Sequence, residues 1–488
     1  MHTKSGLASM DLSKLGADLN IEFAEYPSQA ALLKAIVRNP NASGFDLDKP
    51  AYIAYGKFGD DVNKYQVIIS VMVASATDVD NLLTAFKDEG NNYKASLDGD
   101  KRIFKLNNEP LIVGYDSKRL VAIYAPNNEE CDLQSVLLKH MQYDAADMSR
   151  FGNYDAAMYI NINEVYDAVY GANEQPTENM LEEDIETIET PFDEYISDNA
   201  SAIAGVIFDN GSISCDVELN GVSDKTANLF KSAYAQSYNM LKPSPIAVLN
   251  MGVNGEAFAE LANTAIKAAT EVSGGASNEF NIFKNIALGV IGSINGDLTM
   301  ALSDADGTIS EDALGDKRLL FTKAEALFTA EVTDNYIMKN VESYASSFLK
   351  KSGDKYKVEA FGNDITIGQN DNLFYVGINN NGEKLQTSAA NEEWMNNVTG
   401  SYIFAMVDFN RFFKSGFGKQ AISFLKYNIV ERSEEHMTLT IIDSIDRAYI
   451  TVNGYEDVLH SEVMLTLNEK SKNSLQYIIE TFYGIYFN

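Results

Sequence analysis

The sequence predicts an α+β fold in two similar halves, each with a mainly antiparallel twisted sheet and helices packed on one face. The first observation is that a strand–helix–meander pattern occurs twice, at residues 77–124 and 333–378. The second is that short apolar runs alternate with polar turns, which is typical of antiparallel strands. The third is that helical apolar spacing recurs between these runs. We therefore expect residues 1–242 to form the first half and residues 243–488 to repeat it.

The repeat rests on two matched segments. Both helices begin with a Thr-Asp pair, at 77–78 and at 333–334, and these side chains can accept hydrogen bonds from first-turn N–H groups. Further on, residues 111–114 match residues 374–377 at an offset of 263, against 256 for the Thr-Asp pairs. Seven added residues make roughly two helical turns, so the second helix is predicted to be longer. Its buried face should carry Ile337, Val341, Tyr344 and Phe348.

Turn residues predict how the middle of the chain is arranged. We expect one hairpin at Asp209-Asn210-Gly211-Ser212 and another about Asn295-Gly296, because these residues favour tight turns. Ser223 is expected to cap a helix that runs through Leu241 and ends at Pro243-Ser244-Pro245. That proline-rich segment is the predicted boundary between the halves.

The second half contains further predicted elements. A strand at residues 402–407 ends at Asp408, which is expected to begin a Phe-rich helix. Residues 437–442 are predicted to form another strand, before the strands near 448–452 and 463–467 and a helix at 471–483.

The charge of the chain limits its partners. Its 38 basic residues against 70 acidic residues give a net charge of −32, which opposes nucleic acid and anionic membranes and favours cations or basic partners. Solubility is the alternative reason for such a charge. The two cysteines, Cys131 and Cys215, cannot form a disulfide framework, and whether they pair stays open. No apolar run approaches the ~18 residues of a membrane-spanning helix, so we predict no transmembrane segment.

One motif raises the question of a metal site. Asp304-Ala305-Asp306-Gly307 resembles the middle of an EF-hand loop, in which the glycine permits a sharp turn. With Gly307 in that role, the first ligand position is Leu302 and the last is Ala313, so two needed carboxylates are missing. We therefore assign no metal site and keep Asp304 and Asp306 as candidate ligands to be checked.

Other chemical motifs are absent or incomplete. The four histidines are far apart in sequence, and no pair has the spacing of a helical metal site. Gly416-Phe417-Gly418 follows the start of a helix and not a strand, which argues against a dinucleotide-binding loop. Trp394 could stack on a sugar or anchor a loop, and the loop anchor is favoured. We assign no catalytic residue and no cofactor.

Two segments carry a family resemblance. Phe413-Lys414-Ser415-Gly416-Phe417 and Thr3-Lys4-Ser5-Gly6-Leu7 resemble the segment after the first strand in an uncharacterised secreted lipoprotein family of Bacteroides and relatives, a domain of unknown function. The resemblance implies export to the outer membrane or periplasm, with a lipid anchor, and it carries no catalytic residue across.

The two Lys-Ser-Gly segments also allow an inference about the start of the chain. Lys414-Ser415-Gly416 follows a predicted strand, whereas nothing precedes Lys4-Ser5-Gly6 except the first three residues. A sheet without that strand would have an open edge. We therefore expect Met1 to lie inside a longer natural protein, with its first strand and a lipid anchor upstream.

The sequence favours an extracytoplasmic binding or structural protein over an enzyme. It contains no recognisable nucleophile motif, histidine cluster or phosphate loop, and duplicated sheets can hold a ligand in a cleft. The ligand stays unknown, with a glycan or a protein as the possibilities, and nucleic acid is not expected. The alternative is a carboxylate-dependent hydrolase of glycans or peptides with its site between the halves.

Overall fold

The structure is a computed structural model of a chain that divides into two compact units. One comprises Met1–Leu181, Ser201–Asp216 and Glu469–Asn488, and the other comprises Glu182–Ala200 and Val217–Asn468. The structure describes residues 43–46, 49, 51–57, 65–85, 93–106, 110–125, 133–141, 154–162, 196–272, 278–311, 317–345, 347–428, 432–455 and 457–487. Lys4-Ser5-Gly6 and Cys131 lie outside these residues, so the predictions about the chain start and the cysteine pairing are not tested.

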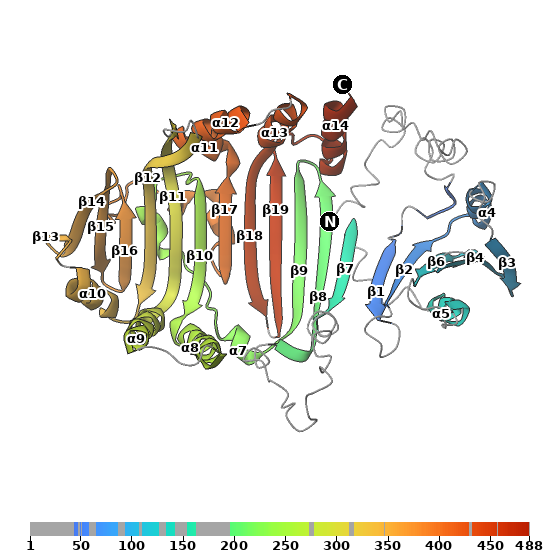
Figure 1. Cartoon of the computed structure of the whole chain (residues 1–488), viewed down its shortest axis with the longest axis horizontal. Coiled ribbons are helices and arrows are strands. Elements are labelled where there is room, and N and C mark those ends of the chain that lie inside the picture. Colours follow the sequence, from blue (N-terminus) through green and yellow to red (C-terminus); the bar gives the residue numbers. More distant parts are fainter. Residues whose placement is uncertain are drawn as a thin grey trace. The chain divides into compact units, whose positions relative to one another are not determined.

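The described part of the chain is a mixture of helices and antiparallel strands arranged in two sheets (Figure 1), which confirms the α+β class. The smaller sheet has six strands in the order β1-β2-β6-β5-β4-β3. Its strands are β1 (Tyr52–Lys57), β2 (Tyr65–Met72), β3 (Tyr93–Asp98), β4 (Lys101–Leu106), β5 (Leu111–Tyr115) and β6 (Arg119–Tyr124).

Helices cover both faces of the six-stranded sheet. On one face, Val79 of α4 (Ala76–Ala85) is buried in a cluster with Tyr115 and Leu120. On the other face, Leu137 of α5 (Leu133–His140) is buried with Ile112 and its neighbours. Successive strand residues point to opposite faces of the sheet, and here both sets are apolar. Each apolar set has a helix to pack against.

The larger sheet has thirteen strands in the order β13-β14-β15-β16-β12-β11-β10-β17-β18-β19-β9-β8-β7. Its strands are β7 (Ala156–Asn161), β8 (Ile196–Asp209), β9 (Ser212–Val222), β10 (Ala247–Asn254), β11 (Ile294–Glu311), β12 (Lys317–Val332), β13 (Lys350–Ser352), β14 (Lys355–Ala360), β15 (Asn363–Asn370), β16 (Leu373–Ile378), β17 (Ile403–Asp408), β18 (Ile445–Tyr455) and β19 (Val458–Leu467). The predicted hairpin at residues 209–212 is confirmed, with Gly211 at a φ of 70° between β8 and β9.

Helices lie at both ends of the central strands of this sheet (Figure 1). At one end are α8 (Gly255–Val272), α9 (Asn278–Ser293) and α10 (Tyr336–Asn340), which continues as a π-helical turn, η6 (Val341–Ala345). At the other end are α11 (Phe409–Lys414), α12 (Gly416–Asn428) and α13 (Arg432–Ser444), whereas α14 (Ser474–Phe487) belongs to the unit that contains the six-stranded sheet. As predicted, a Phe-rich helix begins after Asp408, and the Asp408 side chain caps it by accepting from the Arg411 N–H at 2.8 Å.

Three short 3₁₀ helices cover one face of the thirteen-stranded sheet, which we call the closed face. They are η5 (Gln236–Met240), η7 (Ala389–Asn391) and η8 (Glu393–Asn397). Trp394 of η8 stacks on Phe404 of β17 with ring centroids 5.6 Å apart and meets the edge of Tyr238 at 5.6 Å. Trp394 is buried in this core, so its predicted role as a loop anchor is confirmed.

A small polar network is buried in the closed face. Asn250 of β10 donates to the Thr299 hydroxyl of β11 at 2.8 Å, and Ser237 of η5 bonds the same hydroxyl at 2.9 Å. Nearby, the buried Asp297 carboxylate accepts from the backbone N–H groups of Tyr234 and Gln236. Buried polar groups need such partners, so the network fixes η5 and its flanking loop on the sheet.

Three predicted elements are wrong in detail. Residues 437–442 belong to helix α13 and not to a strand, because a short apolar run fits either period. Asn295-Gly296 lies inside β11, where the register shifts, and not at a turn. The helix capped by Ser223 is α7 (Asp224–Ala227), which ends after four residues and does not reach Leu241.

The repeat is present as an order of connections but not as the predicted residue match. In both sheets a strand leads through a helix into four antiparallel strands, the last of which pairs with the strand before the helix: β6 with β2, and β16 with β12. Gly114, however, lies in β5 and Gly377 in β16, which hold different places in this order. The match at an offset of 263 is therefore wrong, and an internal duplication stays a prediction.

The helix of the second segment is not longer, contrary to expectation. After α10 the chain forms the π-helical turn η6, which has more residues per turn and shifts the phase of the helix face. Ile337 is buried, but Tyr344 and Phe348 are exposed. The seven additional residues do not extend a buried stripe.

Candidate functional site

The side chains of β10 lie in two different environments. Val248 and Asn250 point to the closed face and are buried, whereas Leu249 and Met251 point the other way and are partly exposed. Because successive strand residues lie on opposite faces, the sheet has a second apolar surface. We call it the open face, and it is the face that carries Leu249.

Strand pairing continues the open face across five strands. Leu249 lies opposite Met300 of β11 and Ala405 of β17. Met300 in turn lies opposite Phe328 of β12, and Phe328 lies opposite Val376 of β16. Directly opposed residues share a face, so these side chains form one continuous apolar stripe.

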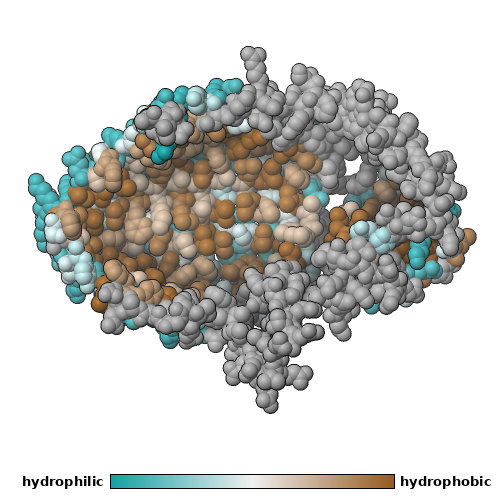
Figure 2. Space-filling model, in the orientation of Figure 1, coloured by the Kyte–Doolittle hydropathy of each residue, from teal (hydrophilic) through white to brown (hydrophobic). Residues whose placement is uncertain are grey.

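The open face is hollowed over these five strands. The hollow, which we call the groove, has a volume of about 540 Å³, within the roughly 300–1,000 Å³ of small-ligand sites. All the described residues that line it are Ala, Val, Leu, Ile, Met or Phe. Figure 2 shows this apolar surface spread over the strands, with hydrophilic residues at its outer margin.

Helices border the groove where the strands end. At one end, Phe258 of α8 and Val290 of α9 pack on a cluster that contains Val253 and Ile294. At the other end, Phe417 of α12 stacks on Phe321 of β12 with ring centroids 4.1 Å apart. The groove therefore has a sheet as its floor and helices at both ends.

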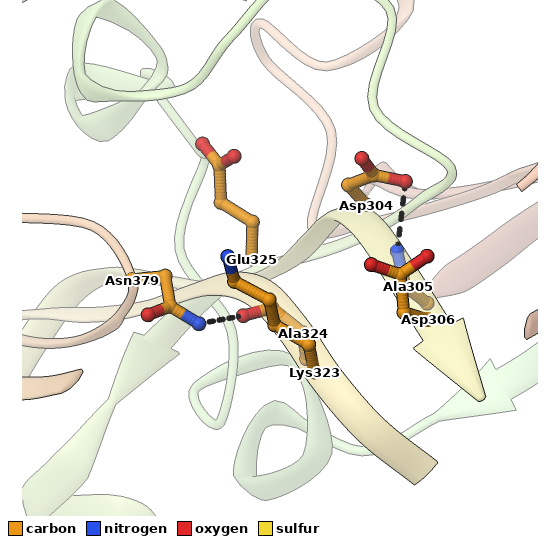
Figure 3. Close-up of a pocket in the computed structure, with 7 residues that line it drawn as sticks. All are labelled: Asp304, Ala305, Asp306, Lys323, Ala324, Glu325 and Asn379. Atoms are coloured by element: carbon orange, nitrogen blue, oxygen red, sulfur yellow. Dashed lines mark hydrogen bonds between the residues drawn. The ribbon is translucent and has the colours of Figure 1, made fainter. Parts of the chain in front are cut away.

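A second, polar pocket contains both candidate metal ligands (Figure 3). It has a volume of about 210 Å³ and is lined by Asp304, Ala305, Asp306, Lys323, Ala324, Glu325 and Asn379. Asp304 lies opposite Glu325, and Asp306 lies opposite Lys323, on the paired strands β11 and β12. The register shifts just before Asp304, so this end of the hairpin is irregular.

Hydrogen bonds and an ion pair hold the polar pocket together. The Asp304 carboxylate accepts from the Ala305 N–H at 2.9 Å, and the Asn379 amide donates to the Ala324 carbonyl at 2.7 Å. The Lys242 ammonium lies 2.6 Å from the Glu325 carboxylate. These contacts stabilise the pocket with groups from three distant parts of the chain.

The polar pocket does not resemble a calcium site. Asp304 and Asp306 lie on an extended strand, whereas EF-hand ligands lie on a tight loop. Within the described residues, no group of three or more His, Cys, Asp or Glu side chains is placed to hold a metal ion. Asp304 and Asp306 lie together in a charged pocket with Lys323 and Glu325.

The remaining sequence motifs contribute no site. Gly416 and Gly418 lie in the first turn of α12, directly after α11, so the segment follows a helix as predicted. Burial, with a smaller effect of the neighbouring Asp216, raises the pKa of the Cys215 thiol on β9. Burial, with a smaller effect of Asp297, raises the pKa of Tyr238 far above its ordinary value.

Comparison with known families accounts for nearly the whole chain. The family described as a domain of unknown function, DUF4836, matches residues 2–475. The chain belongs to this family. No curated protein and no solved structure is significantly similar to it. The DUF4836 match reaches from before the six-stranded sheet to the first residues of α14, so the groove and the polar pocket both belong to the DUF4836 domain.

The predicted resemblance to a domain of unknown function is thereby confirmed, whereas export and a lipid anchor stay predictions. In the part of the DUF4836 chain that the structure describes, no helix is both long enough and apolar enough to span a membrane.

The sequence prediction did not include the groove, although a signal for it exists. β17 reads Ile-Phe-Ala-Met-Val-Asp and β10 begins Ala-Val-Leu, so both alternating sets of side chains are apolar. Such strands are usually buried on both faces. The pattern cannot tell which of the two faces lacks a cover, and among the described residues of this DUF4836 domain one face stays open.

Proposed function

We propose that this protein is a binding protein that holds an aliphatic amphiphile, such as a fatty acid or a lipid, in the groove. The observation that carries the proposal is the open, hollowed apolar floor of the thirteen-stranded sheet. Monomeric proteins rarely expose continuous apolar patches larger than a few hundred Å². A ligand that covers this floor would remove it from water.

The chemistry of the lining favours an aliphatic chain over a protein partner. Protein interfaces depend on Trp, Tyr and Arg anchors, and none of these residues is among those described as lining the groove. Met300 is in the lining, and its flexible methionine side chain can adapt to ligands of irregular shape. A concave floor also fits a thin, flexible chain better than a flat protein surface.

The cellular setting that we propose follows from the family resemblance. An uncharacterised secreted lipoprotein family of Bacteroides and relatives would place the protein outside the cytoplasm, at the cell envelope. Lipids and fatty acids are abundant there, which supports an amphiphile as the ligand. Mass spectrometry of the protein from its native host would test this setting, because a lipidated, processed N-terminus is expected.

The groove is tested with a fluorescent long-chain fatty acid and two matched variants. Met300 is 47% exposed on the groove floor, and Leu320 is 45% exposed on β12 outside the groove lining. Met300→Glu should weaken binding at least tenfold, about 1.4 kcal/mol, because it places a charge against the aliphatic chain. Leu320→Glu should change the affinity less than about twofold.

A second readout is thermal stability. A fatty acid at ~100 times its Kd should stabilise the folded protein by roughly 2.7 kcal/mol, and this shift should be lost in Met300→Glu. Absence of binding by the unmodified protein, or equal losses in both variants, would contradict the proposed function.

A carboxylate-dependent hydrolase is the second candidate, and the polar pocket favours it. Asp304, Asp306 and Glu325 line that pocket together, and paired carboxylates can act as acid and base on glycans. Glycan and peptide panels should then be turned over by the unmodified protein, and Asp306→Asn should abolish the activity. Turnover by the Asp306→Asn variant would show that the polar pocket is not the catalytic site.

A further inference from the structure

The turn between β14 and β15 contains an unusual residue for its backbone conformation. Phe361 and Gly362 connect the paired residues Ala360 and Asn363, and their φ angles are 52° and 74°. Two-residue hairpin turns with both φ angles positive strongly prefer Asn-Gly. A bulky side chain at positive φ is strained, so phenylalanine is a costly choice at this position.

The side chain of Phe361 does not offset that strain by packing. It is 98% exposed, so an apolar ring is held in water at the tip of the β14–β15 hairpin. Phe348, two residues before β13, is 81% exposed. The pairing of Lys350 with Lys357 places Phe348 at the same end of these strands as Phe361. A strained and fully exposed aromatic residue indicates a surface selected for an interaction.

The β13–β14 hairpin that leads into this turn carries an opposed pair of lysines. Lys350 and Lys357 lie directly opposite each other on β13 and β14 and are both exposed. Like charges in this arrangement repel, and among the described residues neither ammonium lies against a carboxylate. Residues 347–362 contain four lysines and two acids. Lys351 and Lys355 pair with Glu342 and Glu383 outside this segment, so Lys350 and Lys357 are the lysines left to face a partner.

We propose that this hairpin, residues 347–362, is a membrane-contact site that binds a phospholipid bilayer. Phe361 and Phe348 would enter the boundary between headgroups and acyl chains, and Lys350 and Lys357 would lie at the level of the lipid phosphates. Aromatic rings and lysines in this combination are typical of interfacial membrane anchors. The negative charge of the rest of the protein is screened beyond about 8 Å at physiological salt, so charges far from this segment contribute little to the contact.

Edge protection is the competing explanation for the lysines, since edge strands commonly carry them against aggregation. It does not explain an exposed phenylalanine at positive φ. The hairpin also lies close to the groove along the chain, because Ile365 of β15, four residues after Phe361, pairs with Ile378 of the groove lining. The membrane contact does not depend on the groove holding a ligand, and the two are measured separately.

The proposal is tested by flotation of the full chain with vesicles of phosphatidylcholine containing about 30% phosphatidylglycerol. Phe361→Asn should lower the bound fraction at least about fivefold, because the ring is removed from the bilayer. The same substitution creates Asn-Gly, so the thermal stability should stay equal or rise. Loss of binding without loss of stability separates a membrane role from a structural one.

Two further variants complete the test. Lys350→Glu with Lys357→Glu should reduce binding and remove its dependence on phosphatidylglycerol and on salt. Tyr455, which is 75% exposed at the end of β18, provides the matched control, and Tyr455→Asn should leave binding unchanged. Failure of the unmodified protein to bind vesicles, or equal binding by Phe361→Asn, would overturn the proposal, even if a protein partner were found for this hairpin.

Discussion

The six-stranded sheet and the outer part of the thirteen-stranded sheet share one order of connections but differ in strand length. β1 and β2 have six and eight residues, whereas β11 and β12 have 18 and 16. Ten helical residues follow in each case, α4 in the first and α10 with η6 in the second. A ten-residue helix is about 15 Å long, and a strand of 16 to 18 residues spans about 53–59 Å.

Among the described residues, this difference explains why the smaller sheet has a helix on each face whereas the larger sheet has one uncovered apolar face. The short helix covers the short strands of the smaller sheet, where Val79 packs on Tyr115 and Leu120. In the larger sheet, Ile337 of α10 packs near Val332 at one end of β12, and the rest of the strand extends beyond it. Lengthening the strands without lengthening the helix is enough to expose an apolar floor.

The largest expected effect contrasts the closed and open faces. Leu327→Ala should destabilise the protein by about 2–5 kcal/mol, because Leu327 is buried in the closed-face core. Met300→Ala on the open face should cost less than about 1 kcal/mol, because the side chain is already in contact with water. Urea denaturation followed by Trp394 fluorescence measures both, since Trp394 lies in the same core as Leu327.

The six-stranded sheet provides the control for this contrast. There Ile112→Ala and Leu120→Ala, on opposite faces, should both be costly, because both side chains are buried. Hydrogen exchange across β5 and β6 reports each loss. Similar costs for Leu327 and Met300 would mean that the open face is covered in solution.

A smaller effect distinguishes Gly114 from Gly377. An added Cβ at Gly377 would lie 2.0 Å from the Asn380 backbone carbonyl, which cannot easily move. At Gly114 it would meet the end of the Leu137 side chain at 2.7 Å, which can change rotamer. Gly377→Ala should therefore cost about 1–3 kcal/mol and Gly114→Ala clearly less, as measured by thermal unfolding. The reverse order would contradict the packing described for these two strands.

The smallest expected effect concerns two carboxylates, one on α4 and one on η6, that each contact a tyrosine on a neighbouring strand. Asp80 of α4 accepts from the Tyr115 hydroxyl and pairs with Arg102. Glu342 of η6 accepts from the Tyr356 hydroxyl at 2.8 Å and lies 3.4 Å from Lys351. The Tyr356 hydrogen bond, followed by Lys351, lowers the pKa of Glu342 below its ordinary 4.5.

A carboxylate with a lowered pKa stabilises the fold above its unfolded value and loses that contribution as the pH falls through the folded value. Tyr356→Phe should therefore raise the pKa of Glu342 back toward 4.5, as an NMR titration would show. The stability difference from the unmodified protein should be present above about pH 5 and disappear at lower pH. An unchanged Glu342 titration would mean that the hydrogen bond is not formed in solution.

Local signals predicted much of the fold. Asp-Asn-Gly-Ser at residues 209–212 gave the β8–β9 hairpin, and Asp408 gave the start of α11, because turn and cap preferences act within a few residues. Residues 437–442 were assigned to the wrong class because a short apolar run carries no clear period. The order of thirteen strands depends on pairings between distant segments, which no local pattern specifies.

The sites were predictable to a lesser degree. Asp304 and Asp306 are two residues apart and lie in one pocket, but Glu325 and Lys242 join them through pairing and packing that sequence spacing does not show. The groove exists because one face of the sheet has no cover among the described residues. The pattern of apolar residues along a strand is the same for a covered and an uncovered face.

The buried network of Asn250, Thr299 and Ser237 has a consequence for how the chain finds its pairing. A strand that is apolar on both sides could slide by one residue with little change in hydrophobic burial, which would exchange its two faces. Such a slip would place the Asn250 amide on the apolar open face, where the Thr299 hydroxyl could not accept its hydrogen bond. The network therefore selects one alignment of β10 on β11 during folding. It thereby decides which of two nearly equivalent surfaces becomes the interior and which becomes the groove.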